Sequence, residues 1–504
     1  SSSSSSAGTP RQGGRRGAAQ AAAAAADDGG LVLAVHVYAS RLLLYLIAHP
    51  AIHTLLSRVA PPNAHAVVHV DALPTYSPTF VSHGGSAPPF SLEGVLKSVE
   101  HAGYREEAQP GGVTLELKPY QRQALGWMLD MEALPRGING LFWEQRPFAD
   151  GGSYYYSPQL GEMRLEPPPT MRGGLLCDEM GLGKTVELMA LIVASLHAPQ
   201  PTPPSGVLPS HATLIVVPPS LVSQWLAEIR KSVGPSSHLT FTKYTSDDLP
   251  RRDAAGLWRE VASRLAAHDV MVTTYGALDR DHAVLPAVQW ARVVLDEMQE
   301  VRSSTTELAR KCERLHAPRR WMVSGTPLYD KIADLQGELY FLRVSPFGAG
   351  LEDGFWRHVI GGPWEEQADS ALDALQVLLR GVMFRHSKSQ THLDGRSILA
   401  LPPKTLTYAP VALDGPELAV YAHLELLFVK ELGRLGAFAG AAGGAVPSLV
   451  QASLRLLRQA CVSPYLLAGG AACADQLKVL EEVCRARLQA TSAHGGGGGG
   501  VDDD

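Results

Sequence analysis

The segment "GGLLCDEMGLGKTVELMALIV" at residues 173–193 places an apolar strand, a glycine-spaced turn and an apolar helix in succession. Glycines let a backbone wrap closely around a phosphate, and the first N–H groups of a helix attract anions. In a phosphate-binding loop, a lysine reaches the β and γ phosphates and the next hydroxyl ligates Mg²⁺, the positions that Lys184 and Thr185 occupy here. Asp178 replaces the first glycine of the strict pattern. Taken alone, the segment therefore leaves open a helix start that only happens to contain glycines.

Two further segments end apolar runs later in the chain. "RVVLDEMQE" ends with Asp296 and Glu297, which predict a carboxylate that holds Mg²⁺ and a neighbour that deprotonates an attacking water. An acidic cap of the next helix is the alternative, and the preceding glycine loop favours the metal site. "WMVSGTPL" closes another run with Ser324, Gly325 and Thr326, which could hydrogen-bond the acid pair and sense a γ-phosphate. By itself, that segment is an ordinary turn.

Apolar runs and helical stretches alternate regularly after residue 173. The runs are "GLLCD", "TLIVVP" (213–218), "LTFTKY" (239–244), "DVMVTTY" (269–275), "ARVVLDE" (291–297) and "RWMVSG" (320–325). Helices are expected at 220–232, 253–267 and 303–315, and an earlier one in "LKPYQRQALGWML". This alternation predicts an α/β fold with a parallel sheet covered by helices on both faces. After Pro402, a strand and two long helices are expected.

Composition narrows the function classes. The net charge of −6 comes from 44 Lys and Arg against 50 Asp and Glu, so DNA binding would need a local patch. Five cysteines without a CxxC pair argue against a disulfide framework or a zinc site and favour a reducing compartment. The apolar run from Leu31 to His49 contains His36 and Arg41, which are costly in a bilayer. It therefore favours a strand and a buried helix over a membrane span, and no membrane partner is expected.

With its three segments in this order, the chain resembles the Swi/Snf-type, helicase-like ATPases of superfamily two. Their loop typically has the sequence D-E-M-G-L-G-K-T, which is residues 178–185 here and accounts for Asp178. The resemblance runs from about Leu117 to Leu467 and implies a RecA-like first lobe followed by the mostly helical start of a second lobe. "LKPYQ", "LIVVPPSLVSQWLAEI", "VMVTTYGAL" and "FRHSK…LPPK" resemble further family segments.

The resemblance also assigns roles by position, with ATP and Mg²⁺ as cofactors. The nucleotide would be bound by Gln121 at the adenine and by Asp178, Glu179, Met180, Gly181, Leu182, Gly183, Lys184 and Thr185 at the phosphates. Mg²⁺ would be held by Thr185 and Asp296, with Glu297, Asp296 and Lys184 as the catalytic groups. Coupling is expected at Gln299, Ser324, Gly325 and Thr326, and contact with double-stranded DNA at Ser220, Gln224, Thr273 and Thr274.

The predicted organisation has five parts. They are a low-complexity disordered tail at 1–30 with some likeness to a transit peptide, a region of unknown role at 31–116, a first ATP-binding lobe at 117–385 with an insertion at 131–170 and a linker at 198–211, the truncated start of a second lobe at 386–490, and a linker at 491–504. The absence of an initiator Met suggests a fragment. We find neither the second-lobe motifs nor RING-type cysteine and histidine spacing in this sequence.

Within the family, the long insertion and "LDEMQ" are similar to the RING-bearing translocases of post-replication repair, first the SHPRH-type (histone-linker, PHD and RING) subgroup and next the helicase-like transcription factor group. The resemblance implies a nuclear, ATP-dependent DNA translocase of DNA damage tolerance, with nucleosomes as a possible further substrate. A ubiquitin-conjugating enzyme is a partner only if a RING lies elsewhere. The alternative is a scaffold in a ubiquitin ligase that holds ATP without hydrolysing it. A metabolic kinase fits poorly, because it leaves "SGT" and the Leu117 segment unexplained.

Overall fold

The computed structural model describes residues 79–80, 90–147, 152–158, 162–248, 257–297, 301, 306–328, 331–347, 356–391, 395–402, 405–436 and 445–467. The chain divides into two compact units, residues 1–400 and 401–504, each described here by itself. None of the helices in these ranges combines the length and the hydropathy that a membrane span requires. The tail at 1–30 and the strand and helix expected from Leu31 lie outside the described residues.

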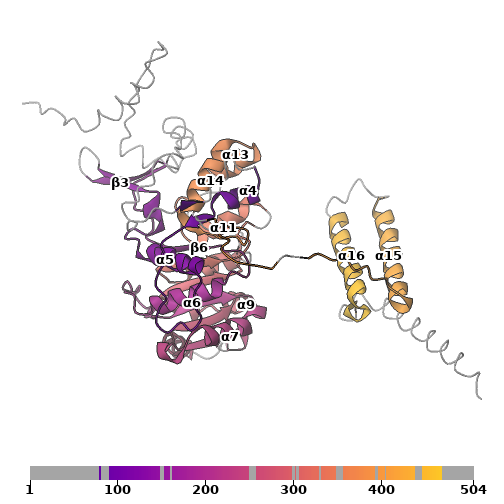
Figure 1. Ribbon diagram of the computed structural model, residues 1–504, viewed down its shortest axis with the longest axis horizontal. Coiled ribbons are helices and arrows are strands. Elements are labelled where there is room, and N and C mark those ends of the chain that lie inside the picture. The colour runs from indigo at the N-terminus through magenta and orange to yellow at the C-terminus, as the bar shows by residue number, and fades with distance from the viewer. Residues whose placement is uncertain are drawn as a thin grey trace, which may run out of the picture. The chain divides into compact units, whose positions relative to one another are not determined.

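A seven-stranded parallel sheet forms the centre of the first unit (Figure 1). Its order is β14-β6-β13-β12-β8-β10-β9, and the strands are β6 (Arg172–Leu176), β8 (Thr213–Val217), β9 (Phe241–Tyr244), β10 (Val270–Thr274), β12 (Arg292–Asp296), β13 (Arg319–Val323) and β14 (Met383–Phe384). Every residue of β8, β10, β12 and β13 is buried, as a strand covered on both faces requires. The six predicted strands are present. Only β14, which has two residues, was not expected.

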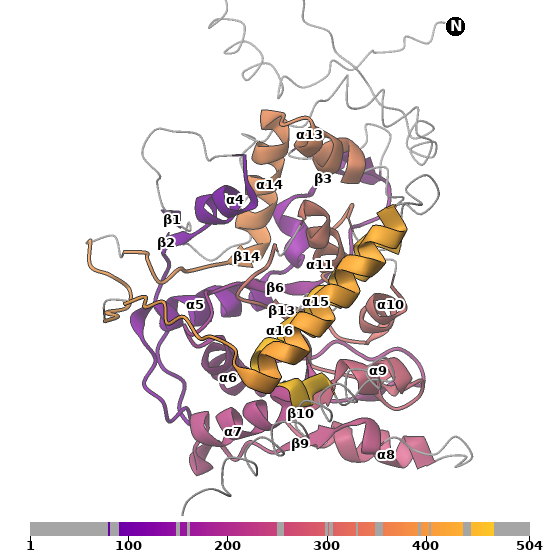
Figure 2. The ribbon, with the colours of Figure 1, turned by 90° about the vertical axis from the view of Figure 1, so that its right-hand side faces the viewer.

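Helices cover both faces of this sheet. α5 (Pro119–Ala133) packs on α6 (Lys184–Ala194), and α6 on α7 (Val222–Ser232). α10 (Glu307–Arg314) packs between α9 (Tyr275–Arg280) and α11 (Leu335–Phe341), and the two groups lie on opposite sides of the sheet (Figure 2). The predicted α/β fold class is confirmed. The unit also contains α8 (Leu257–Ala266), α13 (Gly362–Glu365), α14 (Asp369–Val382) and a π-helical turn at Arg357–Gly361.

The described end of the region at 31–116 belongs to the first unit. It contains α4 (Leu92–Ser98), which packs on α14, and β2 (His101–Gly103), which pairs with β1 (Thr79–Phe80). Val95, Val99 and Tyr104 lie in the same apolar core as the sheet. This segment therefore contributes to the stability of the lobe, which the absence of any motif in it did not indicate.

The insertion at 131–170 is more regular than we expected. Its described residues form an antiparallel sheet of β3 (Glu144–Pro147), β4 (Ser153–Ser157) and β5 (Glu162–Arg164). The three tyrosines Tyr154–Tyr156 form the central strand, and Tyr155 packs on the main core. Within the predicted linker at 198–211, β7 (Leu208–Pro209) pairs with β11 (Val288–Gln289). Strands this short give little period-two signal in sequence.

The division between the units falls at residue 400, after the lobe boundary that we placed at 385. Residues 386–399 stay with the first unit because Ile398 packs in a cluster with Tyr120 and Leu182. The second unit contains α15 (Gly415–Gly436) and α16 (Ala445–Val462), which pack side by side through Val420, Leu424 and Ala460 (Figure 1). The strand expected after Pro402 is absent, since residues 405–414 pair with no strand in the described part of the chain.

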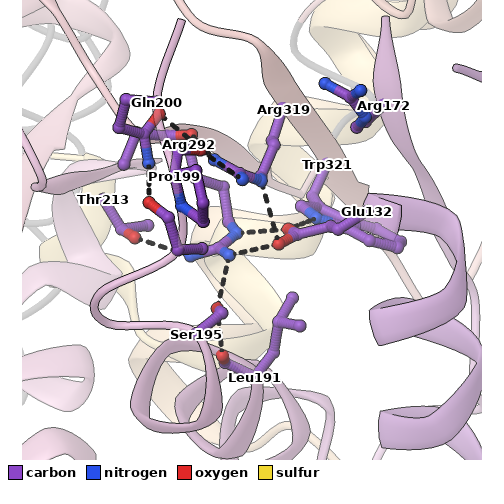
Figure 3. Close-up of polar contacts among 12 residues, drawn as sticks. Glu132, Arg172, Leu191, Ser195, Pro199, Gln200, Thr213, Arg292, Arg319 and Trp321 are labelled. Carbon is purple, nitrogen blue, oxygen red and sulfur yellow. Dashed lines mark hydrogen bonds and ion pairs between the residues drawn. The ribbon is translucent and has the colours of Figure 1, made fainter. Parts of the chain in front are cut away.

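A buried carboxylate joins α5 to the amino ends of two strands (Figure 3). Glu132 accepts two hydrogen bonds from Arg292, both of 2.6 Å, and one of 2.8 Å from Trp321. Nε of Arg319 lies 3.3 Å from the same carboxylate. Arg292 also donates to Oγ of Ser195, the residue that follows α6. The Glu132 carboxylate is the anion that these two buried guanidinium groups share.

We predict that Glu132→Ala lowers the free energy of unfolding of the first unit by about 3–5 kcal/mol, because it leaves buried guanidinium charges without a counter-ion. Urea unfolding followed by tryptophan fluorescence measures this. Glu93→Ala is the matched control, since Glu93 pairs with Lys97 on the exposed surface of α4. That control should unfold as the unchanged chain does, and equal losses in the two variants would contradict the prediction.

Candidate nucleotide site

The carboxyl ends of three neighbouring strands meet at one edge of the sheet. β13 lies between β6 and β12, and Val323 pairs with Leu176 on one side and with Asp296 on the other. The segments that follow these strands are the glycine loop, the acid pair and the Ser-Gly-Thr turn. The structure therefore brings together the three segments that the sequence singled out.

The loop between β6 and α6 has a backbone that only glycine adopts easily. Gly181 and Gly183 have φ angles of 87° and 100°, and Gly183 caps α6, which begins at Lys184. A Cβ at Gly183 would lie 2.4 Å from Nε2 of Gln121. Within the described part of the chain, the N–H groups of Gly183, Lys184 and Thr185 have no acceptor. Together they form a set of donors that a phosphate can accept from.

The Ser-Gly-Thr turn lies directly against this loop. A Cβ at Gly325 would come within 2.5 Å of Cγ of Met180 and 3.5 Å of Nζ of Lys184. Oγ of the buried Ser324 accepts a 3.0 Å hydrogen bond from the N–H of Thr326 and so fixes the turn. The turn is thus close enough to respond to a group bound at Lys184.

The start of α5 holds the loop from the other side. Gln121 and Tyr120 both donate to the carbonyl of Leu182, each at 2.9 Å. The side-chain oxygen Oε1 of Gln121 accepts from the N–H of Lys118 at 2.9 Å. Gln121 is therefore next to the phosphate loop, and its carboxamide joins the loop to α5. Its contact with adenine stays a prediction.

The two carboxylates that precede the glycines, Asp178 and Glu179, accept hydrogen bonds from backbone N–H groups. Oδ1 of the fully buried Asp178 accepts from the N–H of His386 at 2.8 Å, and Oε2 of Glu179 accepts from the N–H of Lys388 at 2.7 Å. The Asp178 carbonyl accepts from the Lys184 ammonium at 2.7 Å. The carboxylate of Asp178, which stands in the place of a glycine, thus ties the loop to the segment that follows β14.

Glu187 is a buried carboxyl group in the first turn of α6. Burial and the adjacent Asp178 carboxylate raise its pKa well above the usual value. The pKa of Tyr120 is also raised, first by burial and then by Glu187. Loss of the Glu187 proton would place a second negative charge beside Asp178 in a buried site, and this is the physical cause of the raised pKa.

Asp296 is a buried acid at the end of β12. Its Oδ2 accepts a 2.6 Å hydrogen bond from Nε1 of Trp225, and its Oδ1 accepts from the N–H of Glu297 at 3.1 Å. Burial raises its pKa to about 6, against a lowering by Trp225 and, more weakly, by the Lys184 charge. Asp296 is thus predominantly ionised at neutral pH, as a metal ligand must be.

The oxygen ligands available here suit a magnesium ion that takes most of its ligands from nucleotide phosphates and water. The described residues hold no cluster of three or more His, Cys, Asp or Glu side chains that could cage a metal. Thr185 and Asp296 would supply one oxygen each, and Mg²⁺ commonly takes its other ligands from phosphates and water. Glu297 has a φ of 53°, a strained value for a side chain of this kind and one that often occurs at functional sites. Gln299 lies outside the described residues.

The four residues expected to contact DNA fall into two groups. Ser220 and Gln224 are exposed at the start of α7. Thr273 and Thr274 are buried, and their hydroxyls are used internally, since Thr273 donates to the Tyr244 carbonyl and Thr274 caps α9. The structure therefore does not present the two threonine hydroxyls to a DNA strand, because they satisfy the backbone where β10 becomes a helix.

Sequence reasoning missed five residues of the site. They are Glu187, Trp225, Tyr275, His386 and Lys388. Trp225 and Tyr275 lie in segments that we had marked, but no spacing distinguishes their side chains from other apolar core residues. His386 and Lys388 lie in "FRHSK", and their partners are far away in the sequence.

Residues 120–466 match the family model described as SNF2-related domain, and the chain belongs to this family. The predicted membership in the Swi/Snf-type ATPases is thereby confirmed. Proteins of this family are, in general, DNA-dependent ATPases that bind a nucleotide together with Mg²⁺.

Several curated proteins are similar to the chain. It is 30% identical over 417 residues to DNA repair protein rad5 of Emericella nidulans, which covers 73% of this chain and 34% of that protein. It is 29% identical over 434 residues to DNA repair protein RAD5A of Arabidopsis thaliana, covering 75% and 40%. The chain thus spans 34% to 40% of the length of these relatives.

A solved structure, the Sulfolobus solfataricus SWI2/SNF2 ATPase core in complex with dsDNA, is 22% identical, with a TM-score of 0.43 and coverage of 76% of this chain and 67% of that chain. Assignment to the SHPRH-type subgroup stays a prediction, since the relatives named above are rad5 proteins.

We predict that Asp296 destabilises the nucleotide-free fold as the pH rises. Its pKa is raised from 3.8 to about 6 on folding, so the folded state holds the proton more tightly. The stability of the unchanged chain relative to Asp296→Asn should therefore fall by roughly 3 kcal/mol between about pH 4 and pH 6 and stay level above. Thermal melts in EDTA measure this, and a constant difference over that range would contradict it.

Proposed function

We propose that the chain carries the nucleotide-binding lobe of an ATP-dependent DNA translocase that acts in DNA repair. The observation that supports this most is the glycine loop, which lies beside Asp296 and the Ser-Gly-Thr turn through strand register. Among the described residues, the N–H groups of Gly183, Lys184 and Thr185 have no acceptor. Family membership supports the ATPase class. The names of the rad5 relatives support the role in repair.

The triphosphate would bind over the start of α6. The loop from Asp178 to Thr185 would surround the β and γ phosphates with its N–H groups, with the Lys184 ammonium turned from the Asp178 carbonyl to the phosphates. Thr185 and Asp296 would hold Mg²⁺, which in such sites neutralises charge on the phosphate oxygens. Gln121 would contact the adenine from the start of α5.

Hydrolysis needs a base beside the γ-phosphate. Glu297 would take a proton from the attacking water as its oxygen bonds to the γ-phosphorus and ADP leaves. Ser324, Gly325 and Thr326 would sense the loss of that phosphate together with Gln299. A Cβ built on Gly325 would lie 3.5 Å from Nζ of Lys184, and this short distance supports a role for the turn in sensing the γ-phosphate.

Double-stranded DNA is the proposed polymer substrate, and the nucleus is the proposed location. Ser220 and Gln224 are exposed where β8 leads into α7, a position that suits phosphate contacts without sequence readout. Contacts of Thr273 and Thr274 would require their backbone N–H groups or a rearrangement. Nucleosomes, a ubiquitin-conjugating enzyme and a role in damage tolerance remain proposals that rest on resemblance to longer proteins.

A second function follows from the electrostatics of phosphoryl transfer. Related nucleotide hydrolases meet transition-state charge with an arginine that raises the rate by about 10³–10⁵. We find no second-lobe arginine motif in the printed sequence. The chain by itself would then be a scaffold that binds ATP and turns it over slowly, for instance within a ubiquitin ligase.

Two substitutions separate binding from hydrolysis. Lys184→Ala should weaken ATP binding by about tenfold or more, because it removes the only side-chain cation that we assign to the phosphates. Glu297→Gln should bind ATP normally and lose turnover by about 10²-fold or more, because it removes the base. Fluorescent-nucleotide titration and phosphate release measure the two effects. Turnover by Glu297→Gln at the unchanged rate would show that another group is the base.

DNA stimulation of ATPase activity decides between translocase and scaffold. For a translocase lobe, we expect duplex DNA to raise the rate of phosphate release, and this effect should fall steeply as salt is added. Lys184→Ala is the blank for contaminating ATPases. A chain that binds ATP but shows no stimulation at low salt would support the scaffold.

A further inference from the structure

Two aromatic side chains, from the helices that follow β8 and β10, donate hydrogen bonds to Asp296. Trp225 in α7 donates its Nε1–H to the carboxylate Oδ2 at 2.6 Å. Tyr275, the first residue of α9, donates its hydroxyl to the Asp296 carbonyl at 2.8 Å. One donor thus fixes the side chain and the other fixes the backbone of the same residue.

Both donors are buried, so water does not compete for these bonds. Trp225 is 3% exposed and Tyr275 is 4% exposed. The second carboxylate oxygen of Asp296 accepts from the N–H of Glu297. Each oxygen of the carboxylate therefore has one protein donor and retains lone pairs that can face a cation.

The sheet order explains how these groups meet. β8 lies next to β12 and β10 lies next to β8, with Leu295 paired to Val216 and Val217 paired to Thr274. The chain turns into α7 after β8 and into α9 after β10. Tyr275 therefore reaches Asp296 across the end of β8, and Trp225 reaches it from the helix that follows this strand.

We propose that Trp225 and Tyr275 are positioning residues that hold the Asp296 carboxylate in the orientation needed to bind Mg²⁺ with its nucleotide. This inference rests on the proposed function, which makes Asp296 the metal-binding acid. Hydrogen-bond partners of metal ligands commonly change metal affinity by about 10- to 100-fold when they are removed. Trp225 acts on the ligating carboxylate, so its removal has the larger effect.

The test is a Mg²⁺ titration of fluorescent-ATP binding to the full chain, with a parallel measurement in EDTA. Trp225→Phe should raise the Mg²⁺ concentration at half-saturation by about tenfold, and Tyr275→Phe, which removes one hydroxyl, by about threefold. Affinity in EDTA should be unchanged in both variants, because the Lys184 and backbone contacts remain.

Matched controls remove equivalent bonds elsewhere in the unit. Trp290→Phe deletes a buried indole donor to the Leu285 carbonyl, and Tyr104→Phe deletes a buried hydroxyl donor to Asp130. Both should titrate with Mg²⁺ as the unchanged chain does, even where they lower the melting temperature. They separate a positioning effect from a loss of packing.

The outcomes distinguish the two claims. An unchanged chain without Mg²⁺-dependent nucleotide binding would overturn the proposed function and this inference with it. If the unchanged chain binds but Trp225→Phe and Tyr275→Phe titrate like the controls, the function stands and the inference is wrong. Equal weakening with and without Mg²⁺ would also overturn it. Should Trp225→Phe fail to fold, Tyr275→Phe carries the test alone.

Discussion

The register of β13 between β6 and β12 is the constraint on which the rest of the site depends. Val323 faces Leu176 and Asp296 at once, so the turn after one strand meets the loop and the acid that follow the others. Backbone pairing sets the distances between the glycine loop, Asp296 and the Ser-Gly-Thr turn. A slip of one residue would reverse the faces of the strand and move Ser324 away from the loop.

Buried carboxylates have different surroundings at the amino and carboxyl ends of the parallel strands, here called the amino and carboxyl edges of the sheet. At the amino edge, Glu132 is saturated with donors from Arg292, Arg319 and Trp321, which joins α5 to β12 and β13. At the carboxyl edge, Asp296 keeps lone pairs free and its pKa is raised by burial. The first arrangement stabilises the fold and the second costs stability that binding of a cation can return. The two edges lie at opposite ends of the same strands.

Much of the fold could be predicted because long apolar runs and helical periods are local. β8, β10, β12 and β13 each contain at least three consecutive apolar residues, which mark them clearly in the sequence. β14, the sheet of β3 to β5 and the unpaired segment at 405–414 could not be predicted, since pairing of short strands depends on distant partners. In the site, glycine and acid positions followed from chemistry. The internal use of Thr273 and Thr274 did not, because a hydroxyl at a strand end serves a backbone or a ligand equally well.

The bonds from Asp178 and Glu179 to His386 and Lys388 have a mechanical consequence. The segment that follows β14 is anchored by these two bonds to the same loop that would surround a phosphate. Only the short carboxylate side chains of Asp178 and Glu179 stand between the loop and the backbone N–H groups of His386 and Lys388, so a shift of the loop is passed directly to this segment. The position of residues 386–388 is therefore set by the loop on which the nucleotide would lie.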